Sequence, residues 1–208
     1  FIPIAEESGL ILSLTEAITR QACAEAMRWP RAQGRDIALA VNLSPKLFSD
    51  PQLVDKVWGW LRDAGMPTHR VELEITESVF LEDPQRALRT LRAFKALGCR
   101  LAMDDFGTGY SSLSYLRHFP LDTIKVDRSL VTDLETQVDA AMIARAVVSL
   151  GKSLGKTVVA EGVEHPSQWA FLRSHGCDEI QGHYFSEALP ASEMESFLQI
   201  NKATPILC

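Results

Sequence analysis

The chain has 208 residues, of which 46% are apolar, and its formal net charge is -6. This length suits one domain with a sizeable core and is short for two. The negative charge argues against a sequence-independent nucleic-acid binder, because such surfaces are basic, so we predict no direct binding of nucleic-acid polymers. A small phosphate ligand stays compatible with this charge if metal ions neutralise the acids locally.

Two further features concern the environment of the protein. No run of about 18 uninterrupted apolar residues occurs, so the sequence predicts no transmembrane helix. The four cysteines, Cys23, Cys99, Cys177 and Cys208, form no close-spaced pair. Isolated thiols of this kind are typical of a reducing compartment, and we expect a cytoplasmic protein.

Helical and β-rich segments alternate along the chain, as judged from apolar spacing and from Gly and Pro at the boundaries. In chain order they are helix Leu10–Ala32, strand Ile37–Asn42, helix Pro51–Ala64, strand Arg70–Thr76, helix Pro84–Leu97, strands Arg100–Asp104 and Thr123–Asp127, helix Leu134–Leu154, strand Thr157–Glu161, helix Pro166–Ser174, strand Glu179–Phe185 and helix Ala191–Ile200. Such an alternation predicts parallel strands with right-handed crossovers. It fits either a doubly wound open sheet or a (β/α)8 barrel, and a barrel would lack two of its eight strands.

Polar side chains lie at the carboxyl end of each of the six predicted strands. A wet loop end explains any one of them, but six in succession predict a site at that rim of a parallel βα fold. These residues are Asn42, Glu74, Asp104 with Asp105, Lys125, Glu161 and Gln181.

The residue types at this rim indicate a hard metal ion. Asn42, Glu74, Asp104, Asp105 and Glu161 offer only oxygen ligands, which suit Mg²⁺ or Mn²⁺ and disfavour zinc. The adjacent aspartates would repel each other, and one or two divalent cations would relieve that repulsion. A pair of such ions is able to activate a water molecule and hold the oxygens of a phosphodiester.

Lys125 has two interpretations. It either orients the water or balances charge in the transition state, or it forms a salt bridge to Asp127 or Glu161 without a catalytic role. The Gly-containing loop Asp105–Gly109 that follows the third strand permits close backbone approach to a ligand, but on its own it is a weak signal.

An ordered series of motifs resembles the EAL domain family of cyclic-di-GMP phosphodiesterases over essentially the whole chain. No single motif is as specific as the series. Its segments are Phe1–Ile11, Val41–Ser44, Glu74–Ser78, Asp104–Leu113, Lys125–Arg128, Ala160–Glu164 and Gln181–Phe185.

The resemblance implies a TIM-like (β/α)8 barrel with one antiparallel strand that hydrolyses cyclic di-GMP to linear pGpG. It implies that two Mg²⁺ or Mn²⁺ ions are held by the five oxygen-bearing residues above together with Asp127, and that Lys125 and Glu161 are catalytic. Glu77 would brace the loop Phe106–Ser111, and Glu164, Gln181 and Gly182 would support the site or contact the ligand. We expect Ca²⁺ to inhibit, because its larger and looser shell fits a tight octahedral site badly.

The signature that names the family is absent, and we expect it and the first two strands to lie upstream of Phe1. Because a barrel without two strands exposes sheet edges, we expect these 208 residues alone to be poorly stable, dimerised or inactive. The resemblance also implies a homodimer, with sensor or diguanylate-cyclase domains in the parent chain. It leaves open whether that parent is free in the cytoplasm or anchored at the inner face of the cell membrane.

Two other functions fit part of the pattern. A catalytically inactive EAL domain would act as a cyclic-di-GMP receptor or regulatory module, and substitutions among its acids would be expected. An unrelated metal-dependent barrel, such as an enolising enzyme, would share acids at strand ends but does not predict the run Asp104–Leu113.

Overall fold

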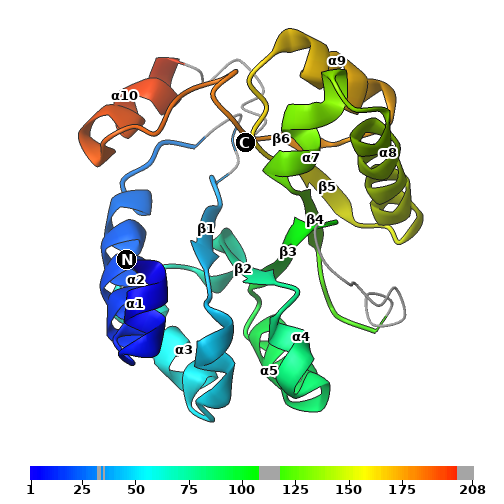
Figure 1. Cartoon of the computed structure of the whole chain (residues 1–208). Helices are drawn as coiled ribbons and strands as arrows, with labels where there is room; N and C mark the ends of the chain where they lie inside the picture. The colour runs from blue at the N-terminus through cyan, green and yellow to red at the C-terminus, as the bar shows by residue number, and fades with distance from the viewer. Residues whose placement is uncertain (32–33, 35, 108–117, 201–208) are drawn as a thin grey trace. The chain divides into compact units, whose positions relative to one another are not determined.

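The computed structural model describes residues 1–31, 34, 36–107 and 118–200 (Figure 1). Within these residues the chain forms two compact units. The first contains Phe1–Leu101 together with helix α10 (Ala191–Ile200), and the second contains Ala102–Pro190.

The first unit carries two parallel strands and a set of helices. Strands β1 and β2 pair in register from Leu39 opposite Val71 to Asn42 opposite Glu74. Besides α10, the elements of this unit are α1 (Ile2–Glu7), α2 (Ile11–Ala26), β1 (Leu39–Asn42), the 3-10 helix η1 (Pro45–Ser49), α3 (Leu53–Asp63), the 3-10 helix η2 (Thr68–Arg70), β2 (Val71–Thr76), α4 (Val79–Glu82) and α5 (Pro84–Ala96).

The core of the first unit forms where α2 packs on α3 and β1, and α3 packs on α5. Apolar side chains at helical spacing, such as Val57 and Leu61 on α3, turn to one face of their helix and are fully buried. Leu73 and Ile75 of β2 are buried as well. This packing fixes the carboxyl ends of β1 and β2, where Asn42 and Glu74 lie.

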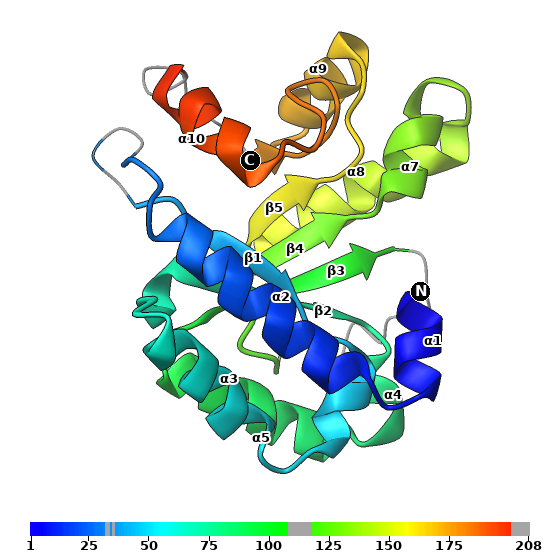
Figure 2. The ribbon, with the colours of Figure 1, turned by 90° about the vertical axis from the view of Figure 1, so that its left-hand side faces the viewer.

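The second unit is a run of βα units whose strands follow chain order, β3-β4-β5-β6, and pair in parallel. Figure 2 shows β3, β4 and β5 with their arrowheads pointing the same way. The elements are β3 (Arg100–Phe106, whose first two residues belong to the first unit), β4 (Thr123–Val126), α7 (Arg128–Thr132), the 3-10 helix η3 (Asp133–Glu135), α8 (Val138–Ser153), β5 (Thr157–Ala160), α9 (Pro166–Ser174) and β6 (Glu179–Ile180).

Helix α8 covers β4 and β5. The two surfaces come so close at Gly151 that a Cβ atom there would lie 2.5 Å from Cγ2 of Val158. All four residues of β4 are buried, and Lys125 is the charged residue among Thr123, Ile124 and Val126. A charged residue in such a strand needs a partner, and the partners of Lys125 define the candidate site.

The predicted alternation of helices and strands is confirmed, and several boundaries are corrected. Helix α2 ends at Ala26 rather than residue 32, because Pro30 disfavours helix before it and the buried Arg70 donates to the Ala26 carbonyl at 2.9 Å. Strand β1 begins at Leu39 and helix α8 at Val138, later than predicted.

The largest strand correction concerns β6, which ends at Ile180 rather than Phe185, because the residues that follow turn back over the end of β5. The short helices α1, α4 and α7 were not predicted, since four to six residues are too few to show a helical period. No helix in the described part of the chain is long and apolar enough to cross a membrane.

Candidate active site

Two adjacent aspartates of the candidate site lie at the carboxyl end of β3. Side chains of neighbouring strand residues normally point to opposite faces. Here the pairing of β3 with β4 shifts between Met103 and Phe106, and Asp105 has a φ of +55°. It is the only residue other than glycine with a positive φ among those described. The irregular backbone therefore allows both carboxylates to serve one site.

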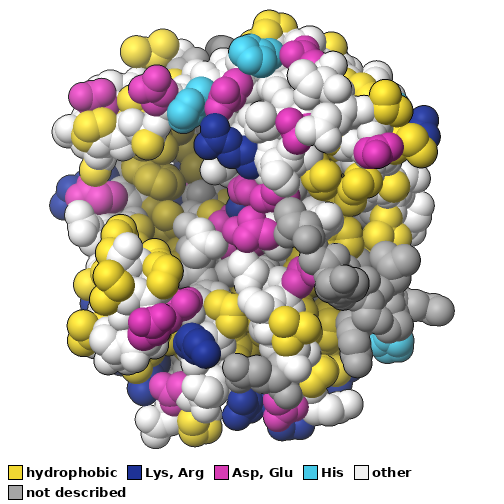
Figure 3. Space-filling model, viewed as in Figure 1, with side chains coloured by type: hydrophobic (Ala, Val, Ile, Leu, Met, Phe, Trp, Pro, Cys, Tyr) yellow, Lys and Arg dark blue, Asp and Glu magenta, His cyan; other side chains and the backbone are white. Residues whose placement is uncertain are grey.

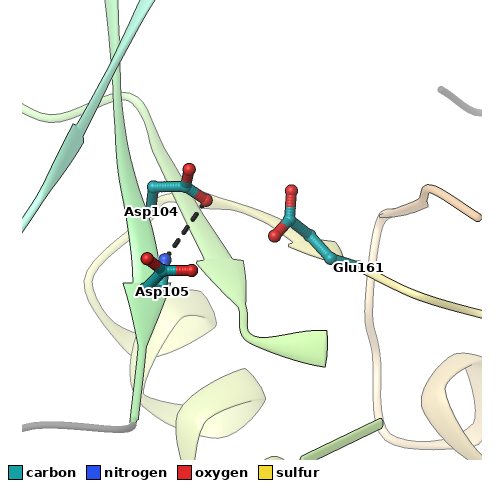
Figure 4. A group of neighbouring side chains, drawn as sticks. All are labelled: Asp104, Asp105 and Glu161. Carbon is teal, nitrogen blue, oxygen red and sulfur yellow. Dashed lines mark hydrogen bonds between the residues drawn. The ribbon is translucent and has the colours of Figure 1, made fainter. Parts of the chain in front are cut away.

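Glu161, directly after β5, completes a group of three carboxylates. Ligand oxygens of Asp104, Asp105 and Glu161 all lie within 4.8 Å of one another. Figure 4 shows the Asp104 and Glu161 carboxylates turned toward each other, and the Asp105 N–H donates to Oδ1 of Asp104 at 3.2 Å. Oxygen atoms from two parallel strand ends thus converge as the sequence predicts.

Lys125 of β4 lies between these acids. Its side chain is almost fully buried, and Nζ lies 3.1 Å from Oδ1 of Asp104 and 2.6 Å from Oε1 of Glu161. The predicted salt bridge to Glu161 is confirmed, and Asp104 is a second partner. A buried ammonium that bridges two carboxylates holds both in place, because without it the two acids would face each other with no compensating charge.

Negative charge exceeds positive charge at this rim. Burial raises the pKa of Asp105, and the negative charge of Asp104 and a side-chain hydrogen bond with Asp127 raise it further. Figure 3 shows acidic side chains gathered near the middle of the face in view, with basic side chains beside them. The excess of crowded oxygen donors suits a hard divalent cation, which would supply the missing positive charge.

Asp127 follows β4 and caps the N-terminus of α7. Its carboxylate accepts hydrogen bonds from the backbone N–H of Ser129 at 2.9 Å and from the Ser129 hydroxyl. Burial acts to raise the pKa of Asp127, but its hydrogen bonds with Ser129, Asp105 and the Arg128 backbone together lower that pKa. Asp127 thus lies beside Asp105 and has a structural role as well, and its place at a metal centre stays a prediction.

The chain segments that follow β5 and β6 are joined by backbone hydrogen bonds close to Glu161. The Val163 N–H donates to the Gln181 carbonyl at 3.0 Å, and the Tyr184 N–H donates to the Val163 carbonyl at 2.9 Å. Gly182 has a φ of +154°, and a Cβ atom there would lie 2.2 Å from the Val163 carbonyl oxygen, so only glycine fits. The backbone of Gln181 is thereby held beside Val163, and its side chain is exposed.

The remaining predicted residues lie in the first unit. Asn42 and Glu74 are register partners at the carboxyl ends of β1 and β2, where the Asn42 side chain is exposed and the Glu74 side chain is buried. Glu77 follows β2, and its carbonyl accepts from the Phe80 N–H. The loop that Glu77 is predicted to brace includes residues 108–111, which lie outside the described residues, as does most of Asp104–Leu113. These roles stay predictions.

Two residues that support the site were not singled out from the sequence. Arg128 donates to Glu164 at 2.8 Å, and the buried Gln168 accepts hydrogen bonds from the backbone that follows Glu161. A signal for Gln168 existed: glutamine three residues after a helix N-cap is a capping pattern. No comparable signal marks Arg128, since its partner lies 36 residues away in the sequence.

Comparison with known proteins assigns the chain to a family. The sequence model of the EAL domain matches residues 1–188. Two curated relatives from Pseudomonas aeruginosa are the cyclic di-GMP phosphodiesterase NbdA, 40% identical over 96% of this chain, and the bifunctional diguanylate cyclase/cyclic di-GMP phosphodiesterase MucR, 39% identical over 93%. The chain spans about a quarter of the length of the curated relatives it matches, with 25% of NbdA and 28% of MucR covered.

Solved structures agree with this assignment. The PaMucR phosphodiesterase in complex with c-di-GMP superimposes with a TM-score of 0.88 at 38% identity, over 93% of this chain and 78% of that one. The calcium/cy-diGMP complex of Klebsiella pneumoniae BlrP1 superimposes with a TM-score of 0.74 at 37% identity, over 83% of this chain and 43% of that one. The predicted TIM-like barrel of the EAL type, incomplete in this chain, is confirmed as the fold class, and the chain belongs to the EAL domain family.

Proposed function

We propose that this domain hydrolyses cyclic di-GMP to linear pGpG with Mg²⁺ or Mn²⁺ bound at its carboxylate group. The observation that carries the proposal is the convergence of Asp104, Asp105 and Glu161 within 4.8 Å, in a chain of the EAL family. NbdA and MucR, which bear the name of cyclic di-GMP phosphodiesterases, support the substrate.

The metal centre would be held by oxygen donors alone. Asp104, Asp105 and Glu161 would be ligands, with Asp127 beside them. Asn42 and Glu74 would complete the set of metal ligands, as the likeness to the EAL family implies. This donor set suits two Mg²⁺ or Mn²⁺ ions, which would lower the pKa of a bound water and neutralise phosphate oxygens.

The chain's own residues would orient the reactants. Lys125 fixes two of the carboxylates through its contacts at 3.1 and 2.6 Å and would direct its ammonium at the attacking water. Glu161, the second predicted catalytic residue, would hold the water on its other side. Gln181 at the rim and the backbone at Gly182 would contact the ligand, while Glu164 and Glu77 would keep the surrounding loops in place.

We place the domain within a larger signalling protein. Its extent, about a quarter of its relatives' length, and the presence of a cyclase activity in MucR support attached sensor or diguanylate-cyclase domains. We propose a homodimer, on the cytoplasmic side of the membrane, with the parent chain anchored there.

Product analysis tests the proposal directly. The purified parent protein that contains this domain is incubated with cyclic di-GMP and Mg²⁺ or Mn²⁺, and the products are identified by liquid chromatography and mass spectrometry. We expect linear pGpG, loss of about 10²–10³-fold in rate for Glu161→Gln, and inhibition when Ca²⁺ is added. Glu135→Gln, which neutralises an exposed carboxylate of η3, is the matched control and should retain activity.

Binding of cyclic di-GMP without any product would instead indicate the receptor alternative. Failure both to bind and to cleave it in the presence of Mn²⁺ would contradict the proposed function altogether.

A further inference from the structure

The segment between β5 and α9, residues 161–165, carries Glu161 and Glu164 and is held by the side chain of Gln168. Gln168 lies in the first turn of α9 and is 3% exposed. Its Oε1 accepts hydrogen bonds from the N–H of Glu164 at 2.8 Å and from the N–H of His165 at 2.9 Å. One amide oxygen therefore fixes two successive peptides, three and four residues after Glu161.

The other end of the same amide reaches a different segment. Nε2 of Gln168 donates to the Val131 carbonyl of α7 at 3.2 Å, in a buried position. Helix α7 starts at the N-cap residue Asp127, whose carbonyl accepts from the N–H groups of Leu130 and Val131 at 3.1 and 3.4 Å. Gln168 thus joins the segment that begins with Glu161 to the short helix that begins at Asp127.

A second contact joins the same two segments on the exposed side. Nη2 of Arg128 donates to Oε1 of Glu164 at 2.8 Å. The stem of Arg128 lies over Gly162, where a Cβ atom would come within 2.2 Å of Cγ of Arg128. This contact is solvent-exposed and contributes little alone, whereas the Gln168 side chain is buried and its bond to Val131 is shielded from solvent.

Loss of the Gln168 amide would release the segment that positions Glu161. Each backbone group left without its buried partner costs about 1–3 kcal/mol, so residues 161–165 would shift to reach water. Ligand sites tolerate displacements of only about 0.5 Å, and residues that orient ligands typically change metal affinity by about 10–100-fold when they are replaced.

We propose that Gln168 is a positioning residue of the metal centre: its buried amide ties residues 161–165 to α7 and so holds Glu161 against Asp104 and Asp105. Gln168 touches neither substrate nor metal and acts through Glu161. The inference rests on the proposed function, because it presumes that these carboxylates bind a divalent cation.

The test measures Mn²⁺ affinity by calorimetry, at a temperature where every variant is folded. Gln168→Met keeps the volume of the side chain and removes all three hydrogen bonds, and we expect its Mn²⁺ dissociation constant to rise about 10–100-fold. Gln137→Met is the matched control: Gln137 is exposed, and its Nε2 donates to Asp133 at 2.9 Å. That variant should bind Mn²⁺ like the wild type.

A second control separates positioning from stability. Leu172, in the same helix α9, is fully buried, so Leu172→Val should lower the melting temperature through lost packing. It removes no hydrogen bond to residues 161–165, and its Mn²⁺ affinity should stay at the wild-type value. Gln168→Met with wild-type Mn²⁺ affinity, or Leu172→Val with an equal loss of affinity, would overturn the inference.

If Gln168→Met does not fold, the Mn²⁺ affinity of Gln168→Glu tests the positioning role instead. It keeps an acceptor for the N–H groups of Glu164 and His165 and replaces the donor to Val131. The added negative charge alone would strengthen Mn²⁺ binding. If the bond to Val131 positions Glu161, its loss should outweigh that effect, and we expect weaker Mn²⁺ binding. Equal or tighter binding overturns the inference. A wild-type protein that binds no Mn²⁺ would overturn the proposed function as well. If the wild type binds Mn²⁺ and the Gln168 variant binds it equally well, only the positioning role is overturned.

Discussion

At the scale of residues, Asp105 occupies a conformation that the pattern of the sequence does not reveal. A regular strand would send Asp104 and Asp105 to opposite faces. The left-handed φ of +55° at Asp105 and the shifted pairing between Met103 and Phe106 change that outcome. Strained backbone of this kind costs about 1–3 kcal/mol and persists at functional sites.

Replacing Asp105 by Asn separates stability from metal binding. Asn tolerates the left-handed conformation and carries no charge in a place where burial and Asp104 raise the pKa of the Asp105 carboxyl. We expect Asp105→Asn to stabilise the metal-free protein slightly, because solvent screens this exposed carboxyl, and to weaken Mn²⁺ binding. Urea unfolding in EDTA and Mn²⁺ titration measure the two effects, and a variant that loses stability would contradict this view of the site.

The two carboxylate partners of Lys125 lead to a further prediction. Lys125→Met leaves Asp104 and Glu161 without the ammonium that bridges them. We expect a loss of about 3–5 kcal/mol in the unfolding free energy of the metal-free protein, because the buried Asp104 and the half-buried Glu161 lose their compensation. We also expect about 10²–10³-fold lower turnover of cyclic di-GMP.

Lys152→Met provides the comparison for Lys125→Met. Lys152 pairs with Asp178 in a largely exposed position, so its loss should change stability by about 1 kcal/mol or less. Equal effects of the two substitutions on stability would contradict a special role for the buried lysine.

The sequence was sufficient to predict that Asp104, Asp105, Lys125 and Glu161 meet, because parallel strands bring their carboxyl ends to one rim. It was not sufficient for Gln168 or Arg128. The capping pattern marks only the local bonds of Gln168. Its bond to Val131 and the bond of Arg128 to Glu164 depend on how α7 and α9 are placed, and residue type does not reveal a partner 36 or 37 residues away.

At the scale of elements, the helices and strands with a clear apolar period were predicted well. Helices α9 and α10 have the bounds expected from the sequence. Strand β6 was predicted too long because aromatic residues such as Tyr184 and Phe185 favour strands. The backbone of Gln181 and Tyr184 instead bonds to Val163, in the segment after β5. Only tertiary contacts, which a local pattern does not contain, distinguish these cases.

Two helical glycines form a matched pair for testing helix packing. Gly59 in α3 has open space where a Cβ atom would lie, whereas Gly151 in α8 lies against Val158 of β5. We expect Gly59→Ala to stabilise the protein by about 0.5–1 kcal/mol, since alanine favours helix. We expect Gly151→Ala to destabilise it by about 1–3 kcal/mol, since α8 must move away from the sheet. Denaturant unfolding measures both, and the same sign for the two would contradict the close packing of α8 on β5.

At the scale of the whole molecule, the pattern of elements alone left two architectures open. Six predicted strands fit an open sheet as well as an incomplete barrel, because both consist of parallel βα units. The choice of a barrel depended on the ordered series of motifs, and the match to the EAL domain over residues 1–188 confirms it. The attached domains and the dimer stay predictions.

The burial of three cysteines offers a way to measure whether the chain is folded. Cys23, Cys99 and Cys177 are buried, and burial raises the pKa of Cys99 to about 11 and that of Cys177 to about 12. Both lie above the usual 9.0, so these thiols stay protonated at pH 8, and the stability that they contribute should fall as the pH rises above about 9.

A thiol titration with Ellman's reagent checks this burial. In a Cys208→Ser variant at pH 8 we expect no rapid reaction while the protein is folded and reaction of all three thiols in guanidinium. Fast reaction of the folded protein would show that at least one of the three thiols is accessible to solvent and would contradict their burial.

The position of bound manganese tests the central claim most directly. Crystals of the protein grown with Mn²⁺ would be measured at the manganese absorption edge, and the anomalous difference map would locate each ion. The account predicts manganese within coordination distance of the carboxylates of Asp104, Asp105 and Glu161. A well-ordered site in which Lys125 bridges Asp104 and Glu161 with no manganese among the three acids would contradict it.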